Sequence, residues 1–363
     1  MIVKNIELKN FRNYENEKID FSPSVNIIYG NNAQGKTNIL EGIYLFSMGK
    51  SNRTHHNEQL IKFGCEKSEI NMDFMCGERE ISARMIINKD KRKSIFMNDI
   101  PVKKNSDLVG KFNVVYFGPE CMDIVKGGPS VRRKNLDILI SQLRPNYFIL
   151  ITNYKKTIEA KRALLKERNI DKITLEILNE RLISLSVEII KYRVEYIKKI
   201  EKISGEIQKE ISFGSEKLEI KYNSDCGIIE EFDGKKVKNS LEDRLMKNYG
   251  KEIELREIFT GPHRDDIEYF INGMNVKNFG SQGQQKTVVL VQKIAEVNLV
   301  KEERGEYPVL LLDDIMSELD FLRQSYILSK IRNMQIIITC TEEERFNILP
   351  DTRKIRIERG RIV

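Results

Sequence analysis

The stretch Gly30-Asn-Asn-Ala-Gln-Gly-Lys-Thr37 decides the fold of this chain, because it fits the phosphate-loop pattern G-x-x-x-x-G-K-[ST]. It follows an apolar run, Val25 to Tyr29, that is typical of a buried strand. A helix is expected to begin at Lys36, so that its positive end faces the bound phosphates. A strand, a phosphate loop and a helix in this order predict a nucleotide-binding α/β fold.

Each part of the loop has a predicted role in holding ATP. The two glycines let the backbone curl so that its N–H groups face the phosphates. Lys36 is expected to reach the β- and γ-phosphates and to act in catalysis, and the Thr37 hydroxyl is expected to bind Mg²⁺. The residues predicted to contact ATP through this loop are Gly30, Asn31, Asn32, Ala33, Gln34, Gly35, Lys36, Thr37 and Asn38.

A second motif lies far downstream, where the apolar strand Val309 to Leu312 ends in two carboxylates. We expect Asp313 to bind Mg²⁺, directly or through water. Asp314 is expected to orient or activate the attacking water, and it is the second predicted catalytic residue. A helix-capping Asp would account for one carboxylate at this place, but not for two.

Two further motifs indicate an active site that is shared between two copies. The segment 281–284, Ser-Gln-Gly-Gln, is expected to open a helix, where a hydroxyl and free backbone N–H groups form an anion site. One chain needs a single γ-phosphate pocket, so Ser281, Gly283 and Gln284 are predicted to contact the ATP held by a second copy. Asp320 would then lie at the seam between the copies. A plain helix cap is the alternative interpretation of Ser281.

Composition excludes several classes of protein. The chain has 363 residues, 40% of them hydrophobic and 32% charged, which is typical of a globular protein with a highly charged surface. No run approaches the roughly 18 apolar residues of a membrane span, and the N-terminus lacks the pattern of a signal peptide. Five scattered cysteines and three histidines offer neither a disulfide framework nor metal-ligand spacing. We therefore expect a cytoplasmic protein without a membrane partner.

The net charge of +7 is compatible with a nucleic-acid partner, without being diagnostic of one. Clusters of Lys and Arg recur along the chain. Those predicted to contact DNA are Lys91, Arg92, Lys93, Arg132, Arg133 and Lys134. Phosphate contacts of this kind would make DNA binding tolerant of sequence and sensitive to salt.

Strand and helix patterns divide the chain into an α/β domain and a helical insertion. Residues 1–128 contain short strands around one helix, and residues 255–363 alternate strands with helices, so both are assigned to one ATPase domain with a mixed or largely parallel sheet. Residues 129–254 are assigned to a mostly helical arm domain, since apolar positions from Ile190 to Ile211 recur every three or four residues. Asn272-Gly273 predicts a hairpin turn.

Together these motifs resemble the ABC-type ATPase heads and, among them, the RecF family of recombination mediators over essentially the whole chain. The other stretches that carry the resemblance are Leu8-Lys-Asn-Phe-Arg-Asn-Tyr14, Lys50-Ser-Asn-Arg-Thr54, Gly118-Pro-Glu120, Lys126-Gly-Gly-Pro129 with Arg132 and Arg133, and Thr260-Gly-Pro-His-Arg-Asp-Asp266. Two roles are open for His263 and Arg264: coupling the hairpin to the helix after Ser281, or tying a turn in place.

The resemblance implies a nucleoid-associated, DNA-binding ATPase of recombinational repair and replication restart, within the SOS response to DNA damage. It implies dimerisation on ATP and Mg²⁺, binding to gapped DNA and single-strand/double-strand junctions, and the partners RecO and RecR. It also implies help in loading a recombinase onto single-strand gaps. Weak, DNA-dependent ATP hydrolysis would reset the dimer.

Two departures from transporter-type ABC ATPases predict slow hydrolysis. Asp314 stands where those enzymes use Glu, and the apolar strand that ends near Thr339 is not followed by their His. Weaker activation of water should keep turnover below about 1 s⁻¹. Two alternatives stay open: a DNA-binding clamp that uses ATP structurally with negligible hydrolysis, and an SMC/Rad50-like ATPase of another role, although its coiled-coil arms would far exceed the insertion here.

Overall fold

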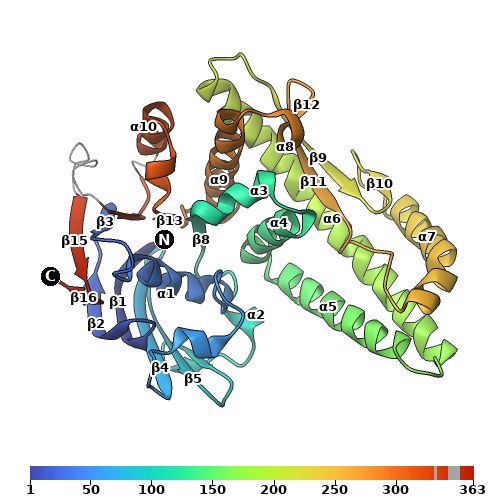
Figure 1. The fold of residues 1–363 in the computed structure, drawn as a ribbon, viewed down its shortest axis with the longest axis horizontal. Coiled ribbons are helices and arrows are strands. Elements are labelled where there is room, and N and C mark those ends of the chain that lie inside the picture. Colours follow the sequence, from blue (N-terminus) through green and yellow to red (C-terminus); the bar gives the residue numbers. More distant parts are fainter. Residues whose placement is uncertain (331–332, 342–351) are drawn as a thin grey trace. The chain divides into compact units, whose positions relative to one another are not determined.

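The computed structural model describes residues 1–330, 333–341 and 352–363, which form two compact units (Figure 1). The first unit joins Met1–Cys121 with Lys293–Val363, and the second is Met122–Gln292. These limits differ from the predicted domain boundaries at 128/129 and 254/255. The segment 255–292 belongs to the same compact unit as the helical insertion, because its strand β11 (Asp266–Ile271) pairs with β9 (Leu218–Ser224).

The first unit contains the predicted parallel sheet. Its strands, in order across the sheet, are β16 (Arg361–Ile362), β15 (Thr352–Glu358), β3 (Val25–Tyr29), β14 (Ile336–Cys340), β13 (Val309–Asp313) and β8 (Val114–Phe117). All neighbours run parallel except β16, which pairs antiparallel with β15 at one edge. The central strands are buried along their whole length, as continuous apolar runs in a parallel sheet require.

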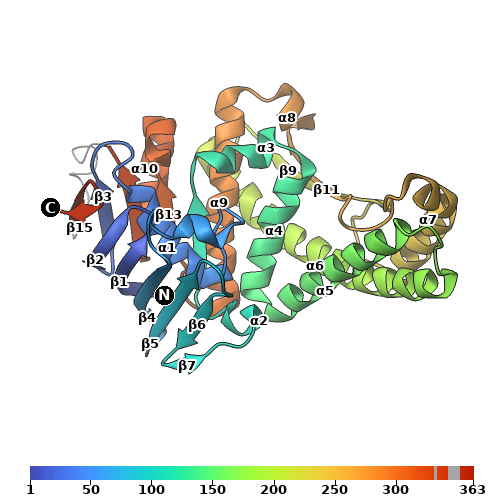
Figure 2. The same cartoon turned by 60° about the horizontal axis from the view of Figure 1, so that its bottom comes forward.

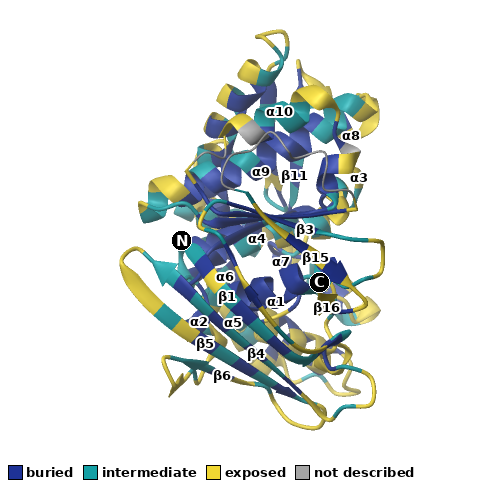
Figure 3. Ribbon diagram, turned by 90° about the vertical axis from the view of Figure 1, so that its left-hand side faces the viewer, coloured by how far each residue is buried: buried dark blue, intermediate teal, exposed yellow. Residues whose placement is uncertain are grey.

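A second sheet in the same unit is antiparallel. Its strands, in order, are β2 (Tyr14–Asp20), β1 (Ile2–Phe11), β4 (Lys67–Cys76), β5 (Arg79–Asn88), β6 (Ser94–Met97) and β7 (Ile100–Pro101). Buried and more exposed residues alternate along β4 and β5, so one face of this sheet meets the core (Figure 3). The helix α1 (Lys36–Met48) joins the two sheets, because it packs on β13 and β14 while Gly42 lies against Ile6 and Leu8.

Helices and short turns complete the first unit. They are α2 (Asn105–Leu108), the greater part of α9 (Gln282–Arg304), α10 (Phe321–Lys330) and the 3₁₀ turns η1 (Asn57–Leu60), η2 (Pro119–Met122, which reaches the second unit) and η3 (Ile315–Glu318). Among the described residues, no helix combines the length and the apolar character that a membrane span requires. The sequence after Asp320 predicts a helix over residues 321–332, which corresponds to α10, and residues 331–332 lie outside the described residues.

The second unit is mostly helical, as predicted for the insertion. Its helices are α3 (Asp123–Lys126), α4 (Pro129–Leu143), α5 (Pro145–Leu165), α6 (Lys172–Ile211), α7 (Gly234–Leu255), α8 (Val276–Phe279) and the first turns of α9. A small sheet has the order β10-β9-β11-β12, with β10 at Gly227–Ile228 and β12 at Met274–Asn275. The predicted hairpin is confirmed, since β11 and β12 pair antiparallel with Ile271 opposite Met274. Figure 2 shows α5 lying along α6.

The helical spacing of apolar residues that the sequence shows from Ile190 to Ile211 also extends over residues 175–187, and both stretches form one continuous helix, α6, of 40 residues. Its N-cap is Asp171, whose carboxylate accepts hydrogen bonds from the backbone of Ile173 and Thr174 at 3.2 and 3.3 Å. Neither Pro nor Gly interrupts the pattern between the two stretches, so nothing ends the helix.

A buried ionic cluster around Arg193 fixes the segment 260–266 to the helices. The Arg193 guanidinium donates to the Pro262 carbonyl at 2.7 Å and to carboxylate oxygens of Asp137 and Asp265, each at 3.1 Å. Removal of Arg193 would leave the buried Asp265 carboxylate without its cation, at a cost of about 3–5 kcal/mol. The segment is therefore a structural joint of the second unit.

His263 and Arg264 tie a turn within this joint. The His263 Nδ1 lies 2.7 Å from the Tyr154 hydroxyl, and its Nε2 lies 3.3 Å from the Ile258 carbonyl. Burial lowers the pKa of His263. Arg264 donates to the same carbonyl at 3.3 Å and stacks over the Phe259 ring at 4.7 Å. The sequence left two roles open for His263 and Arg264, and these contacts favour the one in which they tie a turn in place.

Candidate nucleotide site

The phosphate loop curls tightly between β3 and α1. Its φ angles are 146° at Gly30, 63° at Ala33 and 111° at Gly35, all in the range that favours glycine. A Cβ on Gly30 would collide with the Ile357 carbonyl of β15, and one on Gly35 would lie 2.5 Å from the Asn13 amide nitrogen. Both space and backbone conformation therefore require glycine at the two positions that the motif specifies.

The Lys36 ammonium lies over the loop rather than in solvent. It donates hydrogen bonds to the carbonyls of Gly30 at 2.6 Å and Asn31 at 2.9 Å, and the residue is 6% exposed. Burial lowers the pKa of Lys36, while the nearby carboxylates of Asp314 and Asp313 oppose that shift. A cation held beside backbone N–H groups suits a polyphosphate ligand.

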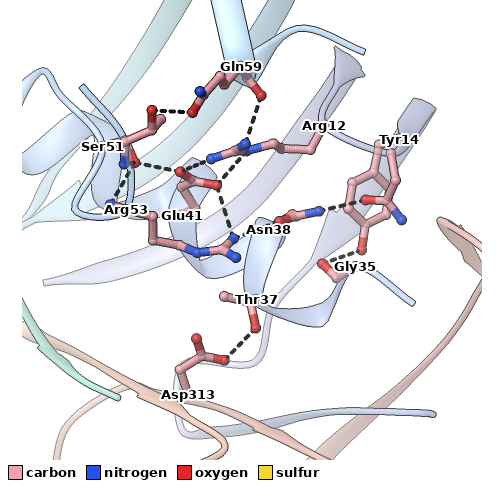
Figure 4. A network of polar contacts seen from close by, with 12 residues as sticks. Arg12, Tyr14, Gly35, Thr37, Asn38, Glu41, Ser51, Arg53, Gln59 and Asp313 are labelled. Atoms are coloured by element: carbon pink, nitrogen blue, oxygen red, sulfur yellow. Dashed lines mark hydrogen bonds and ion pairs between the residues drawn. The ribbon is translucent and has the colours of Figure 1, made fainter. Parts of the chain in front are cut away.

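The hairpin between β1 and β2 holds the loop from outside (Figure 4). The Asn13 amide donates to the Gln34 carbonyl at 2.8 Å, and the Tyr14 hydroxyl donates to the Gly35 carbonyl at 3.0 Å. In a trans peptide the C=O and the following N–H point in opposite directions. Anchoring these two carbonyls therefore turns the N–H groups of Gly35 and Lys36 away from the hairpin.

A buried carboxylate fastens this hairpin to α1, and the sequence motifs did not predict it (Figure 4). The Glu41 side chain is fully buried and accepts two hydrogen bonds from Arg12, at 2.8 and 2.7 Å. Arg53 lies 3.4 Å from Glu41 and donates to the Asn38 amide oxygen at 2.9 Å. Asn38 in turn donates to Asn13 at 2.8 Å. A charged residue within the apolar run that follows the phosphate loop is the signal that could have revealed Glu41.

The structure brings Thr37 and Asp313 together, although they are 276 residues apart. The Thr37 hydroxyl donates to the Asp313 carboxylate at 2.9 Å (Figure 4). Two further hydroxyls, of Thr339 at 2.7 Å and Tyr116 at 2.9 Å, hold the same carboxylate. Neither was predicted, although both follow from their places at the carboxyl ends of strands next to β13. A hydroxyl beside a buried carboxylate is an oxygen donor set that fits Mg²⁺.

Over the described part of the chain, no group of three His, Cys, Asp or Glu side chains is placed to hold a metal ion. Thr37 and Asp313 alone would supply only two protein oxygens. A magnesium ion at this place would therefore take its other ligands from phosphate and water, as it commonly does in nucleotide sites.

Asp314 has a fixed and unusual backbone. Its φ and ψ are 51° and 13°, in the left-handed region that is sparsely populated by residues other than glycine. Its N–H donates to the Thr339 hydroxyl at 3.0 Å, and its carbonyl accepts from Ser317 at 2.8 Å. Such conformations cost about 1–3 kcal/mol and are frequent at functional sites. The backbone thus fixes the direction in which the Asp314 side chain leaves the end of β13.

Asp320 caps α10. Its carboxylate accepts the Arg323 backbone N–H at 3.0 Å and forms an ion pair with the Arg323 side chain. The side chain is 52% exposed, so a second copy could still approach it. That Asp320 lies at the seam between two copies stays a prediction.

Ser281 and Gln284 form a reciprocal helix cap in the second unit. The Ser281 hydroxyl accepts the Gln284 N–H at 3.2 Å, and the Gln284 side chain accepts the Ser281 N–H at 3.0 Å. Gln284 also donates to Glu216 at 2.8 Å, while Gly283 is half-buried. The cap is present, and Ser281 is exposed. A helix N-terminus has four N–H groups without intrahelical partners, and the Ser281 hydroxyl accepts from only one of them, so the cap is compatible with anion binding at the same end of α9.

Three of the six cations predicted to contact DNA are engaged within the protein. The Arg132 side chain is 5% exposed and pairs with both Asp266 oxygens at 2.7 and 2.9 Å. Arg133 donates to the Asp265 carbonyl, and Lys93 donates to the Gly49 carbonyl. The other three, Lys91, Arg92 and Lys134, are exposed. Arg132 in particular supports the joint at 260–266 and offers no free guanidinium to DNA.

The comparisons with known proteins match this chain over nearly its whole length. The family model described as "RecF/RecN/SMC N terminal domain" matches residues 2–362. A Clostridium perfringens (strain SM101 / Type A) protein named "DNA replication and repair protein RecF" is 41% identical over 364 residues, covering 100% of this chain and 99% of the relative.

Solved structures of proteins from the same family are also similar to this chain. One described as "Structure of the recombination mediator protein RecF-ATP in RecFOR pathway" has a TM-score of 0.93 at 37% identity, covering 100% of this chain and 97% of that one. An Smc head domain from Pyrococcus furiosus has a TM-score of 0.58 at 17% identity, which is a likeness of fold alone. The predicted ABC-type ATPase head is thereby confirmed as the fold. With family model, relatives and fold in agreement over its full length, this chain belongs to the RecF family.

Proposed function

We propose that this chain is an ATP-dependent DNA-binding protein of recombinational repair and replication restart, which dimerises on ATP and is reset by slow hydrolysis. The observation that carries the proposal is the 2.9 Å hydrogen bond between Thr37 and Asp313, which joins the phosphate loop to the carboxylate strand. The similar solved structure described as RecF-ATP supports ATP as the nucleotide.

In this proposal the backbone N–H groups of the loop and the Lys36 ammonium bind the phosphates. Thr37 and Asp313 would hold Mg²⁺, which neutralises phosphate charge when it is bound. Tyr116 and Thr339 orient the Asp313 carboxylate, and Asp314 positions and activates the attacking water. The shorter carboxylate and the missing His support slow turnover, and the dependence of that turnover on DNA is part of the proposal that rests on the family resemblance.

Ser281, Gly283 and Gln284 would contact the γ-phosphate held by a second copy, with Asp320 at the seam. DNA gaps and single-strand/double-strand junctions are the proposed substrates, with RecO and RecR as partners in loading a recombinase. The names of relatives support this part, because they refer to DNA replication and repair and to the RecFOR pathway.

The oligomeric state tests the proposal. Light scattering should give a monomer without nucleotide and with ADP, and a dimer with ATP and Mg²⁺, because only the γ-phosphate can join the two sites. Turnover measured on the same sample should stay below about 1 s⁻¹. A monomer under all three conditions would overturn the shared site, and a dimer without any hydrolysis would favour the structural clamp.

Tyr14→Phe should weaken ATP binding about fivefold. The change removes only the hydroxyl that anchors the Gly35 carbonyl, and one hydrogen bond contributes about 1 kcal/mol, or roughly a factor of five. Isothermal titration with ATP measures the effect. The matched control is Tyr307→Phe, which removes a hydroxyl 2.8 Å from Lys301 in the same unit. Equal affinities for the two variants would show that the hairpin does not orient the loop.

A further inference from the structure

The outer face of α5 carries a row of cations, which we call the basic stripe: Lys155, Lys156, Arg162 and Lys166, the last at the helix C-cap. All four are exposed, whereas Tyr154, Ile158 and Leu165 on the opposite face are buried. At 1.5 Å per residue the stripe extends about 16 Å along the helix axis. The same spacing that buries one face of α5 thus gathers cations on the other.

The basic stripe is uncompensated by acidic partners. None of its four cations forms an ion pair with any residue that the structure describes, and Glu159 is the one acidic residue between its first and last members. On the buried face, by contrast, Lys161 pairs with Glu252 at 2.6 Å. A row of like charges without partners is destabilising in itself, and a polyanion would relieve the repulsion.

The neighbouring helix differs in its charge pattern. The exposed charges of α6 mix both signs, and they are Lys172, Glu176, Glu180, Arg181, Glu188, Lys191, Glu195, Lys198, Lys202, Glu206, Lys209 and Glu210. Lys199, which is half-buried, pairs with Glu195 at 2.7 Å. Acidic and basic side chains thus balance one another on the exposed face of α6. An excess of positive charge distinguishes the exposed face of α5 from it.

We propose that the basic stripe binds the phosphate backbone of duplex DNA, an inference that rests on the proposed function and names its DNA surface. Lys and Arg contacts of this kind follow a duplex without reading its sequence. A stripe of about 16 Å spans about five base pairs at 3.4 Å each. Because Tyr147 and Tyr154 of α5 are buried, neither ring can stack on the bases of a single strand.

An anionic membrane fits the stripe less well. A helix that binds a membrane surface needs large apolar side chains beside its cations. The exposed neutral positions between the cations are Ala160 and Ala163, and Ile149, at 44% exposure, lies before the stripe begins. The face therefore offers charge with little apolar surface, which suits phosphates in water.

The test compares two variants with the same loss of charge. One carries Lys155→Gln, Lys156→Gln, Arg162→Gln and Lys166→Gln; the control carries Lys191→Gln, Lys198→Gln, Lys202→Gln and Lys209→Gln on α6. Gln keeps helix propensity, and circular dichroism checks the fold. Affinity for a blunt DNA duplex is measured against salt concentration, with ATP and Mg²⁺ present.

The stripe variant should lose at least about tenfold in affinity at fixed salt, and its slope of log K against log salt should fall by about 0.9 for each phosphate contact removed. The control should change the slope by less than about 1. If the wild type binds duplex DNA and the two variants have equal slopes, the assignment of DNA binding to the basic stripe is wrong, while the proposed function is unaffected. A wild type that does not bind duplex DNA would instead overturn the proposed function. A third outcome would be that the stripe variant loses binding to anionic vesicles but still binds DNA. This outcome would assign the surface to a membrane and would also overturn the inference.

Discussion

Replacement of Ser281 by Arg is expected to abolish the ATP-dependent dimer while ATP binding to the monomer keeps its wild-type affinity. Ser281 is exposed at the start of α9 in the second unit, whereas the phosphate loop belongs to the first. A long guanidinium side chain would fill the space that the γ-phosphate of a second copy requires. We expect the dimer to weaken at least about 100-fold, which corresponds to about 2.8 kcal/mol. Light scattering with ATP, and equilibrium dialysis for nucleotide binding, measure the two effects.

Ser281→Ala separates the shared site from the helix cap. The Ser281 hydroxyl accepts the Gln284 N–H, so its loss alone costs about 1 kcal/mol of helix stability. Ser281→Ala lacks the bulk of Arg and should therefore retain an ATP-dependent dimer, weakened by the lost hydroxyl. If Ser281→Arg dimerises with ATP as the wild type does, the shared-site model is wrong and Ser281 is only a helix cap.

Asp314→Asn should reduce ATP hydrolysis by about 10²–10⁴-fold while leaving the ATP-bound dimer intact and long-lived. General-base catalysis contributes an effect of that size. Asn has nearly the same shape and tolerates the left-handed backbone observed at this position, so the fold of the site should not change. Single-turnover hydrolysis gives the rate, and light scattering after dilution gives the lifetime of the dimer.

Asp313→Asn is the matched control, because it alters the adjacent carboxylate by the same single atom. It should weaken Mg²⁺-dependent ATP binding itself, since the Asp313 oxygens accept from Thr37, Thr339 and Tyr116. Unchanged hydrolysis in Asp314→Asn would exclude Asp314 as the base. Loss of nucleotide binding in both variants would show that the two carboxylates act together in binding rather than in separate roles.

Local patterns in the sequence were sufficient for several parts of the fold. The phosphate loop, the strand that ends at Asp313 and the hairpin at Asn272-Gly273 each depend on residues that are adjacent in the chain, and each was predicted correctly. The strands expected from the sequence in the first 128 residues cover 2–8, 19–21, 25–29, 81–87, 94–97 and 114–117 and do not include β4, although Ile70, Met72 and Phe74 alternate with polar residues. Its Met, Asn and Asp residues lack the β-branched character that identifies strands most clearly.

The cluster Arg132-Arg133-Lys134 shows how a local pattern misleads. Three consecutive cations suggest a solvated surface, yet Arg132 lies one helical turn before Leu136 on the buried face of α4. Helical spacing could have indicated its burial. Its partner Asp266, 134 residues away, could not have been identified in this way.

The order of the motifs along the chain established a nucleotide-binding α/β protein with a helical insertion and named the residues of the phosphate loop, because strand, loop and helix signals are local. The hydrogen bonds that make those residues a site depend on chain segments far apart. Glu41 meets Arg12, and Asp313 meets Thr37 and Tyr116, because the folded chain brings together elements that are distant in sequence. Burial then decides which cations are engaged within the protein and which, as on α5, remain exposed. Such contacts depend on packing between distant elements, and no single stretch of sequence specifies them.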